Sequence, residues 1–255
     1  MNSHRLITVI TVCYNSERAI KRTIDSVINQ TAREKVEFII IDGNSNDATL
    51  DIIKKIHIEN KGLGNFILKS EADAGVYDAM NKGATLATGE WILYLNSGDI
   101  FHDSKIIEDF IQHLEDIDAM VVYGDTIYKN GKKEFYHKSG QAKNLTYKKP
   151  FCHQSVFVRT EIQNKYKFNC KYRIQADYDM FLRIYLDGLK IERWNRIISI
   201  FAQDGISSDP QNYGIVYKEL KCLHKENGLN MINTPILLFY YIKCTLFYLK
   251  TKIHY

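Results

Sequence analysis

Four short, largely apolar runs, each followed by a polar turn and a stretch with helical spacing, constrain the fold of this chain more than any other feature. They lie at residues 6–12, 36–42, 66–69 and 91–95. Consecutive apolar residues are typical of strands buried on both faces of a parallel sheet. Strands that alternate with helices through short connections imply right-handed crossovers. We therefore predict a three-layer α/β/α fold with a mainly parallel sheet over residues 4–125.

The pattern changes after Ala119. Asn130-Gly131 is a strong hairpin signal with strand-like segments on either side. The predicted elements of this second half are strands at 120–123, 126–128, 134–136 and 154–158, a helix at 175–186 and an extended piece at 190–202. Residues 126–215 are therefore expected to form a half of α+β character.

Residues 216–255 are predicted to form a C-terminal helical tail. The stretch 235–249 is apolar around nearly its whole circumference, is interrupted by Lys243, and is followed by further lysines. It is shorter than the ~20 apolar residues that a spanning helix needs. Two interpretations stay open: a helix that lies in the membrane surface through residues 235–252, or a helix packed on the domain or on a second subunit.

Composition excludes several classes of protein. The five cysteines are odd in number and widely spaced, and none forms a C-x-x-C pair. Neither a disulfide framework nor a zinc cluster is indicated, and a reducing cytosol is expected. The first residues lead straight into a strand without a cleavage signal, so we expect the chain to stay inside the cell. The net charge is only +4 and the basic residues are dispersed, which argues against nucleic-acid binding.

Polar clusters follow three of the predicted strands, at residues 11–15, 42–47 and 96–99, and a fourth cluster pairs Asp177 with Asp179 on the predicted helix. Parallel strands bring the first three clusters to one sheet edge, where open α/β sheets bind ligands. A nucleotide base can be held there by Asp or Asn side chains, while a diphosphate needs a cation. Neither a G-x-G-x-x-G nor a G-x-x-x-x-G-K-[ST] motif is present, so the phosphates must be held in another way.

Four segments, three of which contain one of these clusters, resemble a family-2 glycosyltransferase of the A-type, Rossmann-like fold. They occur in the family's order and spacing, at residues 7–15, 38–49, 73–83 and 87–99. The resemblance covers most of residues 6–208 and implies inverting transfer of a sugar from a nucleotide-sugar. It implies a glycosyltransferase domain over residues 1–215, in which 4–125 bind the nucleotide-sugar and 126–215 bind the acceptor.

The resemblance also implies residues that bind the donor. A uracil and ribose pocket would be lined by Thr11, Tyr14 and Asp42, with Asn44 and Asp73 nearby. The further implied donor-binding residues are Asn15, Asn81, Lys82, Asn96 and Gly98. The family often carries Arg at the position of Met80, and Lys82 either substitutes for that Arg or is a solvated helix lysine. The alternative role for Asp42 is that of a carboxylate that stabilises a turn or caps a helix.

The metal-binding motif of the family is reduced in this chain. The usual Asp-x-Asp-Asp reads Asn96-Ser-Gly-Asp99, so one carboxylate remains. Mg²⁺ or Mn²⁺ would need six oxygen ligands, most of which the nucleotide and water can supply. We expect Asp99 to bind such a cation, with help from Asn96 or His153. The alternatives are a helix cap for Asp99 and a buried structural histidine for His153.

Inverting transfer also needs a base, because an acceptor hydroxyl is too weak an acid to attack unaided near pH 7. Asp177 matches the base position of the family's Glu-Asp motif, although Ala176 replaces the Glu. Its spacing places it on the inner face of the helix, where desolvation would raise its pKa, while Asp179 points away with Arg183. The alternative is that Asp177 is only a carboxylate at the N-terminus of the helix, where the helix dipole favours negative charge. Residues 202–208 resemble the family's loop that closes over the donor.

These observations lead to one functional hypothesis and one alternative. The hypothesis is an inverting transferase that moves a sugar from a UDP-sugar to a glycan or lipid-linked acceptor in bacterial polysaccharide biosynthesis. Such an enzyme would use Mg²⁺ or Mn²⁺ and would lie in the cytoplasm, peripheral to the inner face of the cell membrane. The alternative is a non-catalytic nucleotide-sugar-binding or scaffold subunit, because fold alone does not fix function.

Overall fold

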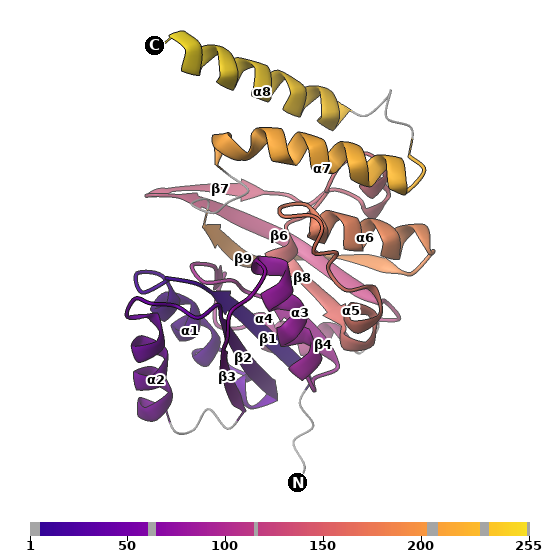
Figure 1. The fold of residues 1–255 in the computed structure, drawn as a ribbon. Coiled ribbons are helices and arrows are strands. Elements are labelled where there is room, and N and C mark those ends of the chain that lie inside the picture. Colours follow the sequence, from indigo (N-terminus) through magenta and orange to yellow (C-terminus); the bar gives the residue numbers. More distant parts are fainter. Residues whose placement is uncertain (1–5, 61–64, 115–116, 203–208, 230–234, 254–255) are drawn as a thin grey trace.

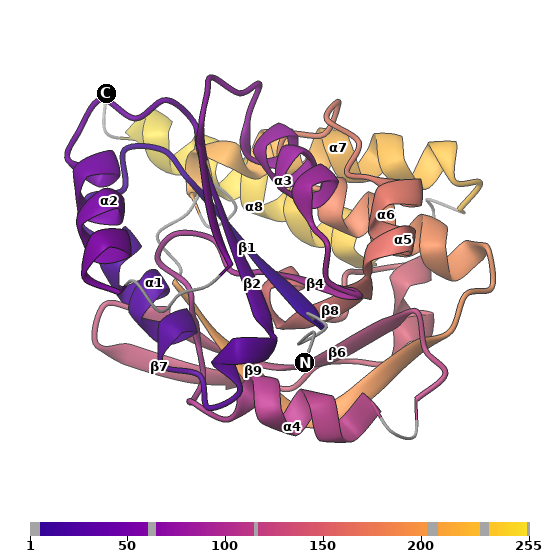
Figure 2. The same cartoon turned by 90° about the horizontal axis from the view of Figure 1, so that it is seen from below.

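The computed structural model describes residues 6–60, 65–114, 117–202, 209–229 and 235–253, and shows one mixed sheet with helices on both faces (Figures 1 and 2). The strands are β1 (Ile7–Cys13), β2 (Val36–Asp42), β3 (Phe66–Ser70), β4 (Trp91–Tyr94), β5 (Ile100–Phe101), β6 (Val121–Asn130), β7 (Lys133–His137), β8 (Val156–Arg159) and β9 (Ile191–Ala202). The helices are α1 (Ile20–Ile28), α2 (Thr49–Glu59), α3 (Val76–Leu86), α4 (Ile106–His113), α5 (Thr160–Tyr166), α6 (Ala176–Leu186), α7 (Tyr213–Glu226) and α8 (Pro235–Ile253).

One side of the sheet is parallel. Within the described ranges the strand order is β3-β2-β1-β4-β8-β6-β9-β5, with β7 beside β6. The first four strands of that order pair in parallel, and Ile7 lies opposite both Val36 and Trp91. Every residue of β1, β2 and β4 is buried, as expected for strands covered on both faces. The predicted α/β class is therefore confirmed.

The other side of the sheet is mainly antiparallel. β8 runs antiparallel to both β4 and β6, whereas β9 runs parallel to β6. The predicted hairpin is confirmed, since Asn130 pairs with Lys133 and Gly131 has a φ of +58°. The sequence predicted two short strands where the structure has the single strand β6. Gly124 interrupts the strand pattern because β9 approaches closely: a Cβ at this position would lie 2.4 Å from the Arg196 carbonyl oxygen.

The helices form two layers, one on each face of the sheet (Figure 2). Alternate residues of β1 serve the two layers, as the period of two in a strand requires. Ile10 and Val12 belong to the hydrophobic cluster that contains residues of α3, α5, α6 and α7. Ile7 and Val9 belong to the cluster that contains residues of α1, α2 and α4. The predicted three-layer arrangement is confirmed.

The two C-terminal helices differ in how far they are buried. Val216, Leu220 and Leu223 of α7 are buried in the same cluster as α6, so the boundary predicted at residue 215 falls inside a helix of this core. Helix α8 lies outside α7 (Figure 1), and its Tyr240 ring is 6.1 Å from the Tyr213 ring of α7. None of the helices in the described ranges has the length and hydropathy to cross a membrane.

Candidate active site

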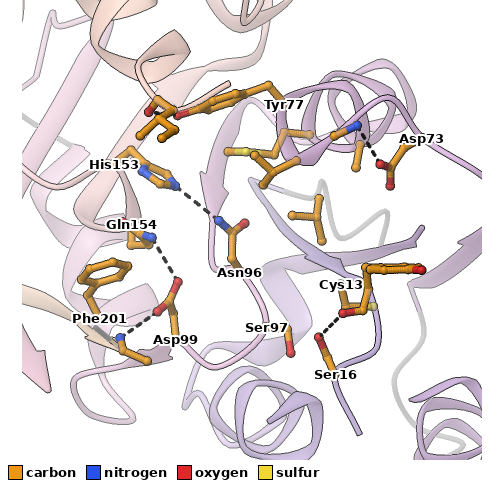
Figure 3. A pocket seen from close by; sticks show the side chains of 18 of the residues that line it. Cys13, Ser16, Asp73, Tyr77, Asn96, Ser97, Asp99, His153, Gln154 and Phe201 are labelled. Atoms are coloured by element: carbon orange, nitrogen blue, oxygen red, sulfur yellow. Dashed lines mark hydrogen bonds between the residues drawn. The ribbon is translucent and has the colours of Figure 1, made fainter. Parts of the chain in front are cut away.

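A cavity of about 430 Å³ lies beyond the carboxyl ends of β1 and β4, next to the end of β9. This volume is in the range of small-molecule binding sites. The predicted site residues that line the cavity are Tyr14, Asp73, Asn96, Asp99 and His153. The last four are labelled in Figure 3. The lining residues that the sequence did not single out include Tyr77, Gln154, Arg173 and Phe201. The three-residue 3₁₀ helix η4 (His153–Ser155) supplies His153 and Gln154.

The loop at residues 96–99 is held in place by helix α1. The Gly98 amide donates to the Thr23 hydroxyl at 2.9 Å, and that hydroxyl donates to the Asp99 carbonyl oxygen at 2.8 Å. Gly98 has a φ of +100°, a backbone conformation that favours glycine. The Arg22 guanidinium lies beside Gly98, because a Cβ there would be 3.1 Å from its nitrogen. The loop is thus fixed by hydrogen bonds between its backbone and the Thr23 hydroxyl of α1.

Asp99 connects this loop to the other wall of the cavity. It is only 3% exposed, and its carboxylate accepts hydrogen bonds from the Gln154 side-chain amide at 3.1 Å and from the Ala202 backbone amide at 3.0 Å (Figure 3). Gln154 belongs to η4, and Ala202 ends β9. These contacts do not support the alternative role of Asp99 as a helix cap, because both partners lie in η4 and β9 rather than in α4.

Two buried polar atoms of the same loop make no hydrogen bond to the described residues. The Asn96 side-chain oxygen and the Ser97 hydroxyl oxygen are buried and have no hydrogen-bond partner among the described residues. Buried polar groups are nearly always hydrogen-bonded in folded proteins, and exceptions often mark ligand sites. Both residues line the cavity, so these oxygens are available to a bound molecule or cation.

Asp177 lies behind the cavity wall rather than in it. The side chain is 1% exposed, and its Oδ2 is 2.6 Å from the Lys149 ammonium and 3.1 Å from the His153 Nδ1. Its Oδ1 accepts a hydrogen bond from the Tyr178 amide at 2.8 Å and one from the Tyr77 hydroxyl at 3.3 Å. Both carboxylate oxygens are therefore occupied by protein groups.

These contacts correct the expected acidity of Asp177. Burial alone would raise the pKa of Asp177, but the Lys149 ammonium and the hydrogen bond from His153 outweigh burial and hold this pKa well below its usual range. The expectation of a raised pKa was wrong, because the contact of Lys149 with this helix could not be predicted from the sequence. Asp179 is paired with Arg183 as predicted, at 2.9 Å, but it is buried rather than pointing away from the core.

His153 stands between Asp177 and the cavity. Its Nδ1 faces the Asp177 carboxylate, and its Nε2 lies 3.4 Å from the Asn96 side-chain nitrogen (Figure 3). One ring nitrogen is therefore held by a buried carboxylate while the other is directed to the cavity-lining loop. This arrangement fixes the orientation of the imidazole ring.

Several residues predicted to bind the donor support the loops around the cavity instead of lining it. Asp42 is fully buried, and its carboxylate accepts hydrogen bonds from the amide of Ser45 and from the hydroxyls of Ser45 and Ser70. The buried Thr11 hydroxyl donates to the Leu95 carbonyl oxygen at 2.7 Å. The Asn15 side chain accepts from the Asn46 amide.

The remaining predicted donor residues also serve the backbone. Asn15 and Asn44 adopt positive φ angles of 48° and 64° in the loops after β1 and β2. Asn81 holds the backbone of Phe168 through both its amide nitrogen and its carbonyl oxygen. Lys82 forms ion pairs with Asp78 and Glu71 at the protein surface. None of these four lines the cavity.

Tyr14 and Asp73 form the open end of the cavity. Tyr14 is 61% exposed, although it is a large aromatic residue. The Asp73 carboxylate accepts from the Gly75 amide at 2.9 Å. Gly43 allows this approach, because a Cβ there would lie 2.5 Å from the Asp73 carboxylate oxygen. An exposed aromatic ring beside a carboxylate suits stacking and hydrogen bonding to a flat polar ligand.

Arg173 is a cavity residue that sequence reasoning missed. It lies just before α6, where Glu219 of α7 accepts hydrogen bonds from three successive backbone amides, those of Arg173, Ile174 and Gln175. No periodicity or motif marks this segment in the sequence. Its position depends on α7, which the sequence assigned to the tail.

The fold and the cavity together define an α/β enzyme with a ligand site at the carboxyl edge of its parallel strands. The family model described as Glycosyl transferase family 2 matches residues 8–185. The chain belongs to this family and is a glycosyltransferase.

Relatives and solved structures agree with this assignment. The PGL/p-HBAD biosynthesis glycosyltransferase Rv2957 of Mycobacterium tuberculosis is 30% identical over 76% of this chain and 75% of its own length. S. aureus TarS 1–349 in complex with UDP-GlcNAc has a TM-score of 0.66 at 18% identity, covering 84% of this chain and 65% of that chain. The mannosyltransferase PcManGT from Pyrobaculum calidifontis, in complex with GDP-Man and Mn²⁺, has a TM-score of 0.67 at 16% identity, with coverage of 94% and 74%. The predicted glycosyltransferase A-type fold is confirmed.

Proposed function

We propose that this chain transfers a sugar from a UDP-sugar to a hydroxyl group of a glycan or lipid-linked acceptor, with inversion at the transferred carbon. The observation that carries the proposal is the meeting of two groups at one cavity. The Asn96–Asp99 loop offers oxygen ligands on one side, and the His153–Asp177 pair offers a proton acceptor on the other. Departure of a diphosphate and activation of a hydroxyl need these two functions.

The donor nucleotide is proposed to occupy the end formed by Tyr14 and Asp73. Tyr14 offers an exposed ring for stacking, and Asp73 offers a hydrogen-bond acceptor. The solved relatives contain UDP, UDP-GlcNAc or GDP-Man, which supports a nucleotide-sugar donor for this chain. Asp42 and Asn15 then act by fixing the two loops that carry this end.

A divalent cation is proposed to bind at the Asn96–Asp99 loop. The residues fit such a cation, because the Asp99 carboxylate and the Asn96 oxygen, which has no hydrogen-bond partner in the described part of the chain, are hard oxygen donors that line the cavity. Among the described residues no group of three or more His, Cys, Asp or Glu side chains could hold a metal, so the diphosphate and water would complete its coordination. A bound cation would offset the negative charge of the departing diphosphate. Arg173, which also lines the cavity, is placed to add to that effect.

Deprotonation of the acceptor is proposed to involve Asp177 through His153. The acceptor oxygen forms a bond to the anomeric carbon, the bond from that carbon to the diphosphate breaks, and the hydroxyl proton passes to His153 Nε2. Asp177 holds the opposite ring nitrogen and stabilises the charge that the ring acquires. This geometry favours a proton-accepting role for His153 over the metal-ligating role predicted from the sequence.

Contact with the membrane surface is proposed for the outer face of α8. Leu238, Phe239, Tyr241, Ile242 and Leu246 are each between 47% and 62% exposed on this helix. An exposed apolar and aromatic helix face is typical of segments that lie at the boundary between headgroups and acyl chains. A peripheral position at the inner face of the cell membrane would bring a lipid-linked acceptor to the enzyme.

Release of UDP tests the proposal directly. The full chain is incubated with a panel of UDP-sugars in the presence of Mn²⁺ or Mg²⁺, and UDP is measured with a coupled assay. We expect at least one UDP-sugar to release UDP, and the same sugar to raise the thermal unfolding temperature. Release of no UDP from the whole panel, with thermal stabilisation intact, would instead support a binding subunit.

A further inference from the structure

The segment at residues 129–149 concentrates positive charge. It contains seven lysines and one glutamate, a formal net charge of +6, whereas the whole chain carries +4. The rest of the chain is therefore net negative, and the dispersed distribution expected from the sequence does not hold. Clustered charge of this kind raises the local concentration of oppositely charged ligands.

Both ends of this lysine-rich segment lie at the candidate active site. At the first end, Lys129 of β6 pairs in register with Ala202 of β9, and the Tyr128 ring is 5.6 Å from the Phe201 ring. Ala202 and Phe201 line the cavity. At the other end, Lys149 binds the Asp177 carboxylate. The hairpin of β6 and β7, seen in Figure 1, therefore begins beside residues that line the cavity.

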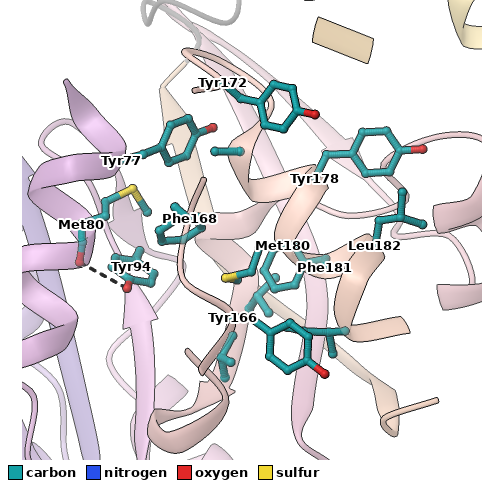
Figure 4. Packing of buried hydrophobic residues seen from close by; sticks show 14 of the residues in the cluster. Tyr77, Met80, Tyr94, Tyr166, Phe168, Tyr172, Tyr178, Met180, Phe181 and Leu182 are labelled. Atoms are coloured by element: carbon teal, nitrogen blue, oxygen red, sulfur yellow. Dashed lines mark hydrogen bonds between the residues drawn. The ribbon is translucent and has the colours of Figure 1, made fainter. Parts of the chain in front are cut away.

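The backbone of the segment is anchored, while all of its lysines except Lys149 are exposed or pair at the surface. The Ser139 hydroxyl donates to the Gly124 carbonyl oxygen, the Tyr123 hydroxyl donates to Gly140, and the Tyr178 hydroxyl donates to Leu145. Tyr178 and Leu145 belong to one buried cluster, and Figure 4 shows the part of it that includes Tyr178. A fixed backbone reduces the conformational entropy that a ligand would otherwise have to remove on binding.

Most of the lysines in the segment have no acidic partner. Lys129 pairs with Glu134, and Lys149 pairs with Asp177. In the described part of the chain, no ion pair is formed by the exposed lysines 132, 133, 138, 143 and 148. Two large aromatic side chains of β7 in the same segment, Phe135 and Tyr136, are 52% and 57% exposed. Exposed aromatic rings can stack on the apolar faces of sugar rings. Ammonium groups in the same segment can bind the anionic substituents of those sugars.

We propose that the lysine-rich segment is a docking surface for an acceptor glycan that carries phosphate or carboxylate groups. The inference rests on the proposed transferase function and adds the chemical class of its acceptor. The nucleotide end of the cavity is formed elsewhere, by Tyr14 and Asp73, so the segment is left to the acceptor. A membrane is the less favoured occupant, because the apolar face suited to lipid lies on α8 and the segment adjoins the cavity instead.

Binding of defined polymers to the full chain tests the inference. The probes are inorganic polyphosphate and polygalacturonate as anionic polymers, and dextran as a neutral one, measured by titration calorimetry. The test variant is Lys132→Glu with Lys133→Glu, and the control is Lys54→Glu with Lys55→Glu, an adjacent surface pair on α2. A second variant, Lys143→Glu with Lys148→Glu, covers the case in which the first fails to fold.

The expected result is binding of at least one anionic polymer but not of dextran. Charge reversal in the segment should weaken it about tenfold or more, while the α2 control binds like the wild type. Equal weakening in the control, or no binding of either anionic polymer, would overturn the inference. Binding of phosphatidylglycerol vesicles that depends on these lysines, without polymer binding, would assign the segment to the membrane and also overturn it. Failure of the proposed transferase function would be recognised separately, because the wild type and every variant would then release no UDP.

Discussion

The His153 Nδ1 lies 3.1 Å from the Asp177 carboxylate, and only His153 of the two lines the cavity. This relationship predicts that both residues are needed for turnover but not for binding of UDP. We expect His153→Asn and Asp177→Asn to lower UDP release by about 10²- to 10⁴-fold, the usual contribution of general acid–base catalysis. Thermal stabilisation by UDP should persist in both. Normal turnover in His153→Asn would remove the histidine from the proton path.

The position of the Asp99 carboxylate predicts metal-dependent binding of UDP. Asp99→Ala should weaken binding of UDP in the presence of Mn²⁺ by about tenfold or more, with little change when the metal is withheld. Gln154→Ala is the matched control, because it removes one hydrogen bond to Asp99 and leaves the carboxylate. Titrations of UDP with and without Mn²⁺ distinguish the two variants. Equal losses in both variants would indicate that Asp99 has only a structural role.

The sequence predicted the sheet edge better than it predicted the contacts within the site. Continuous apolar runs and short connections determine a parallel order, and that order brought the 96–99 loop to the cavity. The pairing of Lys149 with Asp177 could not be predicted, because Lys149 follows an irregular segment whose path depends on the packing of Tyr178 against Leu145. Asp42 was expected at an open pocket, but Ser45 and Ser70 enclose its carboxylate.

The ion pair of the buried Asp125 with the half-buried Arg193 predicts a pH-dependent contribution to stability. The Arg193 guanidinium lies 2.8 Å from the Asp125 carboxylate, which also accepts from the Ser139 amide at 2.9 Å. Burial opposes ionisation, but hydrogen bonds from Tyr136 and Ser139 and the charge of Arg193 hold the pKa of Asp125 below its ordinary value. Asp125→Asn should therefore lower the free energy of unfolding at pH 7 by about 3 kcal/mol.

The sign of this dependence follows from the depressed pKa of Asp125 in the folded state. Its contribution is complete above the unfolded pKa of about 3.9 and is lost as the pH falls through the folded value. The difference between wild type and Asp125→Asn should be constant from about pH 5 to pH 8 and shrink below about pH 4. Urea unfolding of both proteins across this range measures it. A difference that stays unchanged in acid would contradict the assignment.

The exposed face of α8 predicts binding to lipid vesicles. Leu238→Glu with Ile242→Glu should reduce flotation of the chain with vesicles of phosphatidylglycerol and phosphatidylethanolamine, because each change places a charge where an apolar side chain would enter the interface. Ile58→Glu is a matched control, since Ile58 is 64% exposed on α2. Unfolding temperatures of all variants should stay near that of the wild type. Undiminished flotation of the α8 variant would exclude this face as the lipid contact.

Truncation experiments should distinguish the roles of the two C-terminal helices. A chain that ends at residue 215 would lose Val216, Leu220 and Leu223 from the core, and it would also lose Glu219, which fixes the backbone before α6. A chain that ends at residue 229 keeps all of these and lacks only α8. Removal of three buried aliphatic side chains costs about 2–5 kcal/mol each, comparable in total to the stability of a whole domain.

We therefore expect the chain ending at residue 229 to unfold cooperatively and to release UDP, but to lose vesicle binding. The chain ending at residue 215 should show no cooperative unfolding transition. Circular dichroism during heating measures folding, and the coupled UDP assay measures activity. A stably folded, active chain ending at residue 215 would show that α7 is an appendage, as the sequence alone suggested. Loss of folding on removal of α8 alone would show that this helix stabilises the core in addition to any contact with lipid.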